Sequence, residues 1–193
     1  HRYLHLSIRR QRQMCIRDRE TTEHMERDAA STSATSLATI GIPLRTSHEY
    51  RKSPRDHLNW LSRRWLFNIP RSGKVEGMRP LGRLAFVDHQ EHIRNQLQKG
   101  IDQIFHGDAA RASNEQTQLP FTRDGLDFVI VGSTSGGTCS GSLLDAAALL
   151  RSLLSEKRLP PCSVTALLMH GTGNSAPLAD MQDANTVSFL KEG

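Results

Sequence analysis

The feature that most constrains this chain is an uninterrupted passage from a strand pattern, through a run of glycines, into an apolar helix. Residues 126–131 (LDFVIV) are mostly apolar and rich in β-branched side chains, as expected of a buried parallel strand. They lead directly into GSTSGGTCSG, after which residues 143–154 have the leucine and alanine content of a packed helix. A strand, a glycine loop and a helix in this order predict a parallel α/β sheet.

The other apolar segments extend this pattern. Residues 164–169 (VTALLM) predict a second buried strand, and residues 84–104 predict an amphipathic helix. We further expect a packing helix, a glycine-rich loop, a surface insertion and a last helix, at residues 57–70, 71–83, 106–123 and 181–192 respectively. The predicted fold class is α/β, with a Rossmann-like parallel sheet flanked by helices.

The first 35 residues differ from the rest. Arginines crowd residues 9–19 without a clear apolar face, and a small-residue, Ser/Thr-rich stretch of the linker kind follows at 29–39. The run QRQMCIRDR also resembles translated adapter sequence. We therefore expect residues 1–35 to be disordered or non-native, and residues 36–193 to form one partial domain; the alternative for 1–35 is a basic, disordered arm.

Charge and cysteine content exclude several functions. The net charge of +5 arises before residue 84, because residues 84–193 carry a net charge of −4. Aromatic residues make up 5% and do not alternate with the arginines, so we predict no nucleic-acid binding. No apolar run reaches the roughly 20 residues of a membrane span. Three scattered cysteines without a CxxC pair fit a reducing cytoplasm and predict no metal site.

The glycine-rich run indicates a site for an anion. The first turn of a helix has unpaired backbone N–H groups and the positive end of the helix dipole. Glycines let the backbone approach a phosphate closely, and the carboxyl end of a parallel strand is where α/β folds bind ligands. The run lacks the GK[ST] of a P-loop, so these features predict phosphate binding without naming the compound.

A family resemblance narrows the prediction. The seven residues Ser135-Gly136-Gly137-Thr138-Cys139-Ser140-Gly141 resemble the tubulin signature [SAG]-G-G-T-G-[SA]-G, and six of the seven positions match. Cys139 is the exception, because the family has glycine there. Upstream, GMRPLGR (residues 77–83) is similar to an earlier phosphate loop of FtsZ. The segments MRPLGRLAF and DANTVSFLKE look closest to bacterial tubulin-like proteins, and the resemblance covers residues 73–190.

The resemblance implies a guanine-nucleotide-binding, assembly-forming GTPase domain of the tubulin/FtsZ type. Residues 135–141 would cradle the phosphates of GTP, and Mg²⁺ would be carried by the nucleotide. A second wall would come from Gly77, Arg79, Gly82 and Arg83, and Asp183 or Asp180 would approach the ribose. The full-length protein would form a homo-oligomer or filament. We expect this truncated chain to be inactive as a GTPase, because the family's first glycine-rich loop and its downstream catalytic loop have no counterpart here.

Two alternatives remain open. GSTSGG has the shape of a nucleophile elbow, so the chain could be an α/β-hydrolase with Thr134 or Cys139 as nucleophile. Alternatively, it could be a non-catalytic tubulin-like assembly module. Cys139 favours that module if its position needs a positive φ angle, which a non-glycine residue adopts at a cost of about 1–3 kcal/mol.

Overall fold

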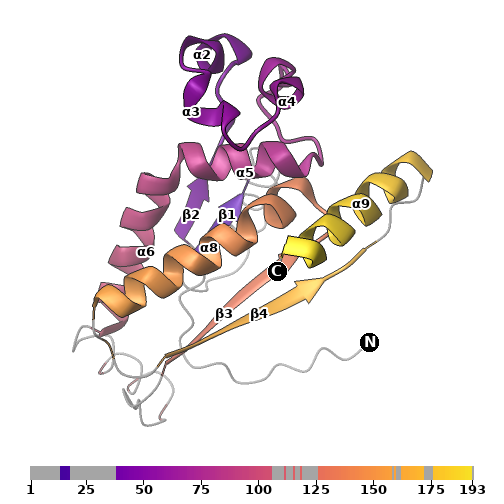
Figure 1. Cartoon of the computed structure of the whole chain (residues 1–193). Helices are drawn as coiled ribbons and strands as arrows, with labels where there is room; N and C mark the ends of the chain where they lie inside the picture. The colour runs from indigo at the N-terminus through magenta and orange to yellow at the C-terminus, as the bar shows by residue number, and fades with distance from the viewer. Residues whose placement is uncertain are drawn as a thin grey trace.

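The computed structural model describes residues 14–17, 38–105, 126–157, 162–171 and 176–192, together with Arg111, Glu115, Gln118 and Leu159. Figure 1 shows the arrangement of the elements. In chain order they are β1 (Met14–Arg17), β2 (Ala38–Gly41), α2 (Ser47–Lys52), α3 (Arg55–Leu58), α4 (Arg63–Phe67), α5 (Arg79–Asp88), α6 (Gln90–Phe105), β3 (Leu126–Ser133), α8 (Gly137–Glu156), β4 (Cys162–Met169) and α9 (Ala176–Glu192).

The centre of the fold is the unit β3–α8–β4. The two strands pair in parallel, from Leu126 opposite Cys162 to Ser133 opposite Met169, and α8 connects them. β1 and β2 form a second parallel pair. The prediction of an α/β fold with parallel strands and packed helices is therefore confirmed. β1 lies within residues 1–35, and the rest of that segment is outside the described residues.

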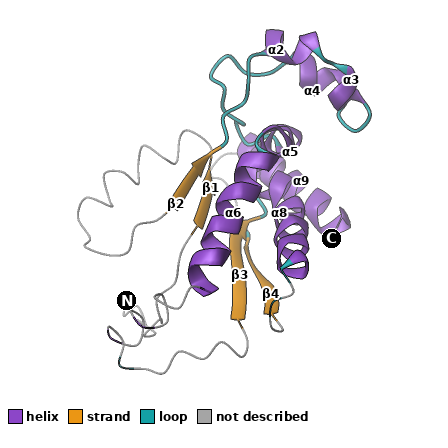
Figure 2. Cartoon of the chain, turned by 90° about the vertical axis from the view of Figure 1, so that its left-hand side faces the viewer, coloured by secondary structure: helices purple, strands orange, loops and turns teal. Residues whose placement is uncertain are grey.

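The core lies where α5, α6 and α8 pack together (Figure 2). Its most buried side chains include Leu81, Leu84, Phe86, Ile93 and Leu153. The strands show one face to this core, through Phe128, Ile130 and Val164. On the other face Val129, Val131 and Leu167 are 56–58% exposed. Within the described part of the chain, helices thus cover one face of the β3–β4 sheet.

The first turns of α5 and α8 cross without side chains between them. A Cβ on Gly141 would lie 2.7 Å from the backbone nitrogen of Arg83, and one on Gly82 would lie 2.9 Å from the Cα of Thr138. A Cβ on Gly137 would likewise lie 2.6 Å from the nitrogen of Met78. All three distances are too short for a real side chain, so these glycines are required for the helices to approach.

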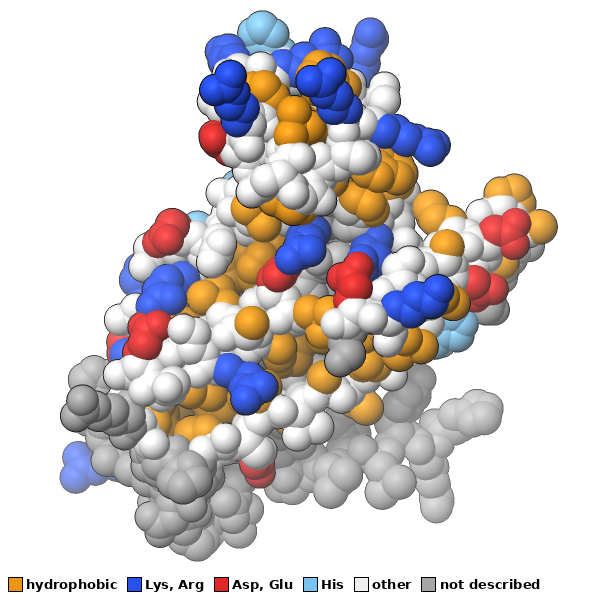
Figure 3. Space-filling model, viewed as in Figure 1, with side chains coloured by type: hydrophobic (Ala, Val, Ile, Leu, Met, Phe, Trp, Pro, Cys, Tyr) orange, Lys and Arg blue, Asp and Glu red, His pale blue; other side chains and the backbone are white. Residues whose placement is uncertain are grey.

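Helices α2, α3 and α4 form a small module beside α5 (Figures 1 and 2). Its first helix begins with a capping box, in which Thr46 and Glu49 exchange side-chain-to-backbone hydrogen bonds. Buried Asp88, at the end of α5, accepts a hydrogen bond from Tyr50 and pairs with Arg45, which ties the module to the body. Exposed basic residues gather on this module (Figure 3): Arg51, Lys52, Arg55, Arg63, Arg64 and Arg71.

Several predicted boundaries are wrong for local reasons. The single helix expected over residues 57–70 is two short helices, α3 and α4. The loop expected over 71–83 ends early, because Pro80 sits in the first turn of α5, where its missing N–H costs nothing. The helix expected over 84–104 breaks at His89, and α9 begins before residue 181. Most of the insertion expected at 106–123 is outside the described residues. None of the helices in the described ranges is long and apolar enough to cross a membrane.

The glycine crossing predicts a large effect of a single methyl group. Gly141→Ala should lower the free energy of unfolding by about 1–3 kcal/mol or more, because the new Cβ meets the backbone of α5, which cannot rotate away. Urea denaturation followed by circular dichroism measures this loss. Gly41→Ala is the matched control, since a Cβ there meets nothing within 4 Å and should leave stability nearly unchanged. Equal stability of the two variants would contradict the close crossing.

Candidate functional site

The glycine-rich segment is shorter as a loop than predicted. β3 runs through Ser133, the chain bends at residues 134–136, and α8 begins at Gly137. Five of the seven signature residues, 137–141, therefore form the first turns of a 20-residue helix. What remains between strand and helix is the bend Thr134–Ser135–Gly136, which we call the phosphate bend after the role predicted for it from the sequence. Gly136 is extended (φ −81°, ψ 148°) and a Cβ on it would meet nothing within 4 Å.

Two helix N-termini converge at this bend. Gly77, in a left-handed conformation (φ 75°), precedes α5 and lies against Gly137, the first residue of α8. Neither N-cap residue, Met78 of α5 or Gly136 of α8, provides a side-chain hydrogen bond to its helix. Neither helix has an acidic residue in its first turn. Two positive dipole ends therefore meet where neither an N-cap side chain nor an acidic residue of the first turn compensates them.

Asn185 of α9 joins the two segments. Its side-chain nitrogen donates to the carbonyl oxygen of Gly77 (2.8 Å) and to that of Ser135 (2.9 Å). The residue is 7% exposed. The structure thus brings the start of residues 77–83, the predicted second wall of the site, next to the phosphate bend, and α9 connects the two. Sequence reasoning missed Asn185, although it lies inside DANTVSFLKE, because only the neighbouring acid attracted attention.

His170, directly after β4, lies on the other side of the bend. Its Nδ1 is 3.0 Å from the hydroxyl oxygen of Ser135 and 3.0 Å from that of Thr186. The hydroxyl of Ser135 also accepts a hydrogen bond from the N–H of Gly171 at 2.9 Å. On its outer side, Nε2 of His170 is 3.5 Å from Asp183. The predicted ribose-side residue Asp183 is therefore near the bend, with an imidazole between them, whereas Asp180 makes no such contact.

Comparison with known proteins identifies the chain. A family model described as "Tubulin like" matches residues 3–192. The chain belongs to the tubulin-like family. No curated protein and no solved structure matches it. The match begins at residue 3, so it includes β1 and most of the segment before residue 36.

The tubulin-like signature residues are unequally accessible. Ser135, Gly137, Ser140 and Gly141 are buried, the last under α5, whereas Gly136 and Thr138 are partly exposed. The hydroxyls of Ser140 and Ser142 bond to carbonyls one turn earlier in α8, those of Gly136 and Thr138. Much of the signature therefore builds the helix and its packing, and Gly136 and Thr138 are its partly exposed positions.

The two arginines of the second loop pair with carboxylates along α8 and α9. Arg79 forms a two-pronged pair with Glu192 (2.6 and 2.7 Å) and also donates to the carbonyl of Ser140. This pair lowers the pKa of Glu192 through its hydrogen bonds to the guanidinium. Arg83 pairs with Asp145, which lies in the third turn of α8. Contacts of these arginines with phosphate stay a prediction that would require the pairs to open.

Cys139 occupies the signature glycine position without backbone strain. It lies within α8, and it is absent from the positive-φ residues of the described chain. Its sulfur fills the space in which a Cβ on Gly132 of β3 would stand. The concern that Cys139 distorts the segment is therefore removed, because its backbone is helical and glycine at position 132 makes room for the thiol. Burial raises the pKa of this thiol, against a smaller effect of a hydrogen bond with the Ser133 backbone.

The hydrolase alternative finds no support in this geometry. The hydroxyl of Thr134 is buried and bonds to the carbonyl of Met169 and to Thr186, not to a histidine. Ser135 does contact His170, but its side chain is enclosed, with 3% of the residue exposed. A substrate carbonyl could not reach it without moving the bend. Among the described residues, no group of three or more His, Cys, Asp or Glu side chains could hold a metal ion.

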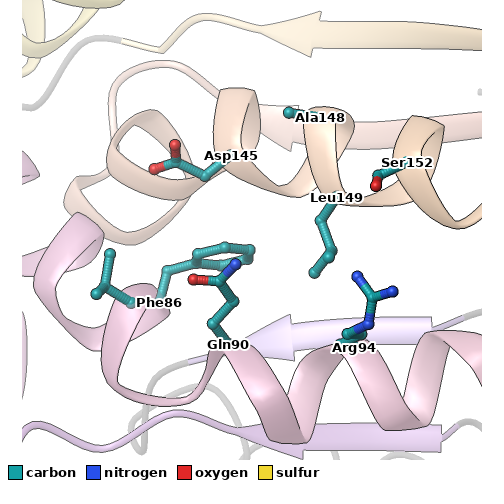
Figure 4. A pocket seen from close by; sticks show the side chains of 8 residues that line it. Phe86, Gln90, Arg94, Asp145, Ala148, Leu149 and Ser152 are labelled. Carbon is teal, nitrogen blue, oxygen red and sulfur yellow. The ribbon is translucent and has the colours of Figure 1, made fainter.

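A cleft of about 300 Å³ lies elsewhere, between α5, α6 and α8. Figure 4 shows Phe86, Gln90 and Arg94 facing Leu149 and Ser152 across it. Asp145, at its end nearest the bend, is nine residues beyond Gly136, which corresponds to roughly 14 Å along the helix. This cleft is therefore separate from the phosphate bend.

The buried thiol predicts low reactivity. At pH 7.5 Cys139 in the folded chain should react with iodoacetamide at least roughly tenfold more slowly than in the urea-unfolded chain, because burial disfavours the thiolate. The rate should rise as the pH rises, since more thiolate forms. Peptide mass spectrometry measures the label at this position, with Cys139→Ser to confirm the assignment. Equal rates in the folded and unfolded chains would show an exposed thiol and reopen its role as a nucleophile.

Proposed function

We propose that this tubulin-like domain binds a guanine nucleotide, with its phosphates at the phosphate bend. The observation that supports this most strongly is the convergence of α5 and α8, two uncapped helix N-termini, at the carboxyl end of β3. This edge of a parallel sheet is where α/β domains bind ligands. A phosphate there would accept hydrogen bonds from backbone N–H groups in the first turn of α8, whose N-cap residue provides no side-chain bond.

Electrostatics favour an anion at this point. Each helix N-terminus favours a negative charge by about 0.3–1 kcal/mol at exposed sites and up to about 2 kcal/mol when partly buried. Two such ends at one place repel each other in the absence of an anion, and the described first turns provide no carboxylate. One bound phosphate group would attract both helix N-termini and so offset the repulsion between them.

The proposal divides the predicted site residues by role. The backbone of Gly136, Gly137, Thr138 and Cys139 would contact phosphate. Ser135, Ser140, Gly141, Gly77 and Gly82 would support that backbone, because they are buried, bridged by Asn185 or packed between the helices. Asp183 would approach the ribose from beside His170, and Mg²⁺ would arrive with the nucleotide.

The wider parts of the proposal depend on the family. We infer that the full-length protein is a cytoplasmic GTPase that forms a homo-oligomer or filament, closest to bacterial tubulin-like proteins. The chain of 193 residues would bind nucleotide without turning it over. The alternative of a non-catalytic assembly module is kept, because the second loop's arginines are already paired with Glu192 and Asp145.

Gly136 provides a sharp test of the site. Gly136→Asp should weaken binding of a fluorescent GTP analogue with Mg²⁺ by about tenfold or more. The new carboxylate can cap α8 and repels phosphate by roughly 1–4 kcal/mol at about 4 Å. Open space and an extended backbone at this position keep the fold intact. Gly136→Ala is the matched control, because it adds a Cβ without charge and should weaken binding much less than Gly136→Asp does.

Competition by unlabelled GTP and ATP in the same assay ranks the bases, and guanine should be preferred. Circular dichroism and thermal melting establish that each variant is folded. If the unchanged chain is folded but binds neither GTP nor ATP, the proposed function is wrong and the assembly-module alternative is favoured.

A further inference from the structure

The side chain of Asn185 connects two segments of the site, a role that its position within α9 does not indicate. Of the described side chains, it is the one that hydrogen-bonds to both the phosphate bend and the segment before α5. The two segments are far apart in sequence, since Ser135 and Gly77 lie 50 and 108 residues from Asn185. The residue is buried, so water cannot readily replace it there.

The chemistry of the bond requires an amide. A side-chain NH₂ group has two hydrogens, and here the nitrogen lies 2.8 and 2.9 Å from two backbone carbonyl oxygens. An aspartate of the same shape has no hydrogen to donate when ionised and would repel both carbonyls. An alanine would leave two buried carbonyl oxygens without their partner, which is costly in a site shielded from water.

Helix α9 holds both segments at further points. The Met181 side chain packs against Gly77, where a Cβ would lie 3.1 Å from its sulfur. Thr186 lies 3.1 Å from the hydroxyl of Thr134, in the bend. At the far end of α9, Glu192 pairs with Arg79, the first residue of α5. α9 is therefore attached to both sides of the site, and Asn185 is its central attachment.

We propose that Asn185 is a positioning residue that sets the separation between the phosphate bend and the Gly77 segment, which is the part of the chain just before α5. Through this separation it would determine the preference for a nucleoside triphosphate over a diphosphate. This inference rests on the proposed function and adds to it that the Gly77 segment lies near the terminal phosphate of a bound triphosphate. A diphosphate held at the bend needs one segment in place. A triphosphate also needs the second segment at the correct distance.

The test compares GTP and GDP on the full chain. Asn185→Ala and Asn185→Asp should weaken GTP binding by about tenfold, whereas GDP binding should fall less than about threefold. The ratio of the two dissociation constants should therefore change in favour of GDP. Ser188→Ala, an exposed substitution on the same helix, is the control and should leave both constants unchanged. Isothermal titration calorimetry well below the melting temperature measures each constant.

Each outcome has a distinct meaning. If the Asn185 variants lose equal affinity for GTP and GDP, Asn185 is a structural residue and the proposal is wrong. The proposal is also wrong if neither affinity changes. Failure of the unchanged chain to bind both nucleotides would instead defeat the proposed function. Should the Asn185 variants not fold, Met181→Ala tests the same idea, because it loosens the Gly77 segment from α9 while the hydrogen bonds stay. It should shift the ratio in the same direction, and an unchanged ratio would overturn the proposal.

Discussion

The close crossing of α5 over the first turns of α8 is the constraint on which the rest of the structure depends. Gly82, Gly137 and Gly141 leave no side chain between the two backbones. The crossing buries the start of α8, brings the residue before α5 against the phosphate bend, and aligns the two helix N-termini. A helix pair held by larger side chains would stand about 8–10 Å apart and could not place both termini at one anion.

This crossing changes the meaning of the glycine signature. A glycine-rich turn after a strand is ordinarily explained by the approach of a phosphate to the backbone. Here Gly137 and Gly141 are explained by the approach of another helix, and Gly136 is the residue left with open space. The signature therefore serves two requirements at once, since the same packing that needs the glycines also creates the junction at which an anion would bind.

The sequence predicted those parts of the fold that depend on local patterns. The strands near 126–131 and 164–169 and the helix after the glycines were found, because buried parallel strands and apolar helices have distinctive composition. Parts that depend on long-range contacts were missed or misassigned. The contacts of His170 and Asn185 with Ser135 and Gly77 span 35 to 108 residues, and no neighbouring residue in the chain indicates them. Cys139 seemed strained because its position was expected in a loop, whereas it lies within α8 and its thiol has room beside Gly132, on another element.

The polar side chains around the bend follow from the same geometry. A bend that is almost closed to water cannot leave its carbonyls and hydroxyls without partners. Asn185 satisfies the carbonyl of Ser135, and the N–H of Gly171 satisfies its hydroxyl, so both bonds hold one residue from opposite sides. Hydrogen bonds that hold the bend in the absence of a ligand would lower the entropy that binding must overcome. At the start of α8, where the N-cap residue Gly136 makes no side-chain hydrogen bond, a bound phosphate would extend this network.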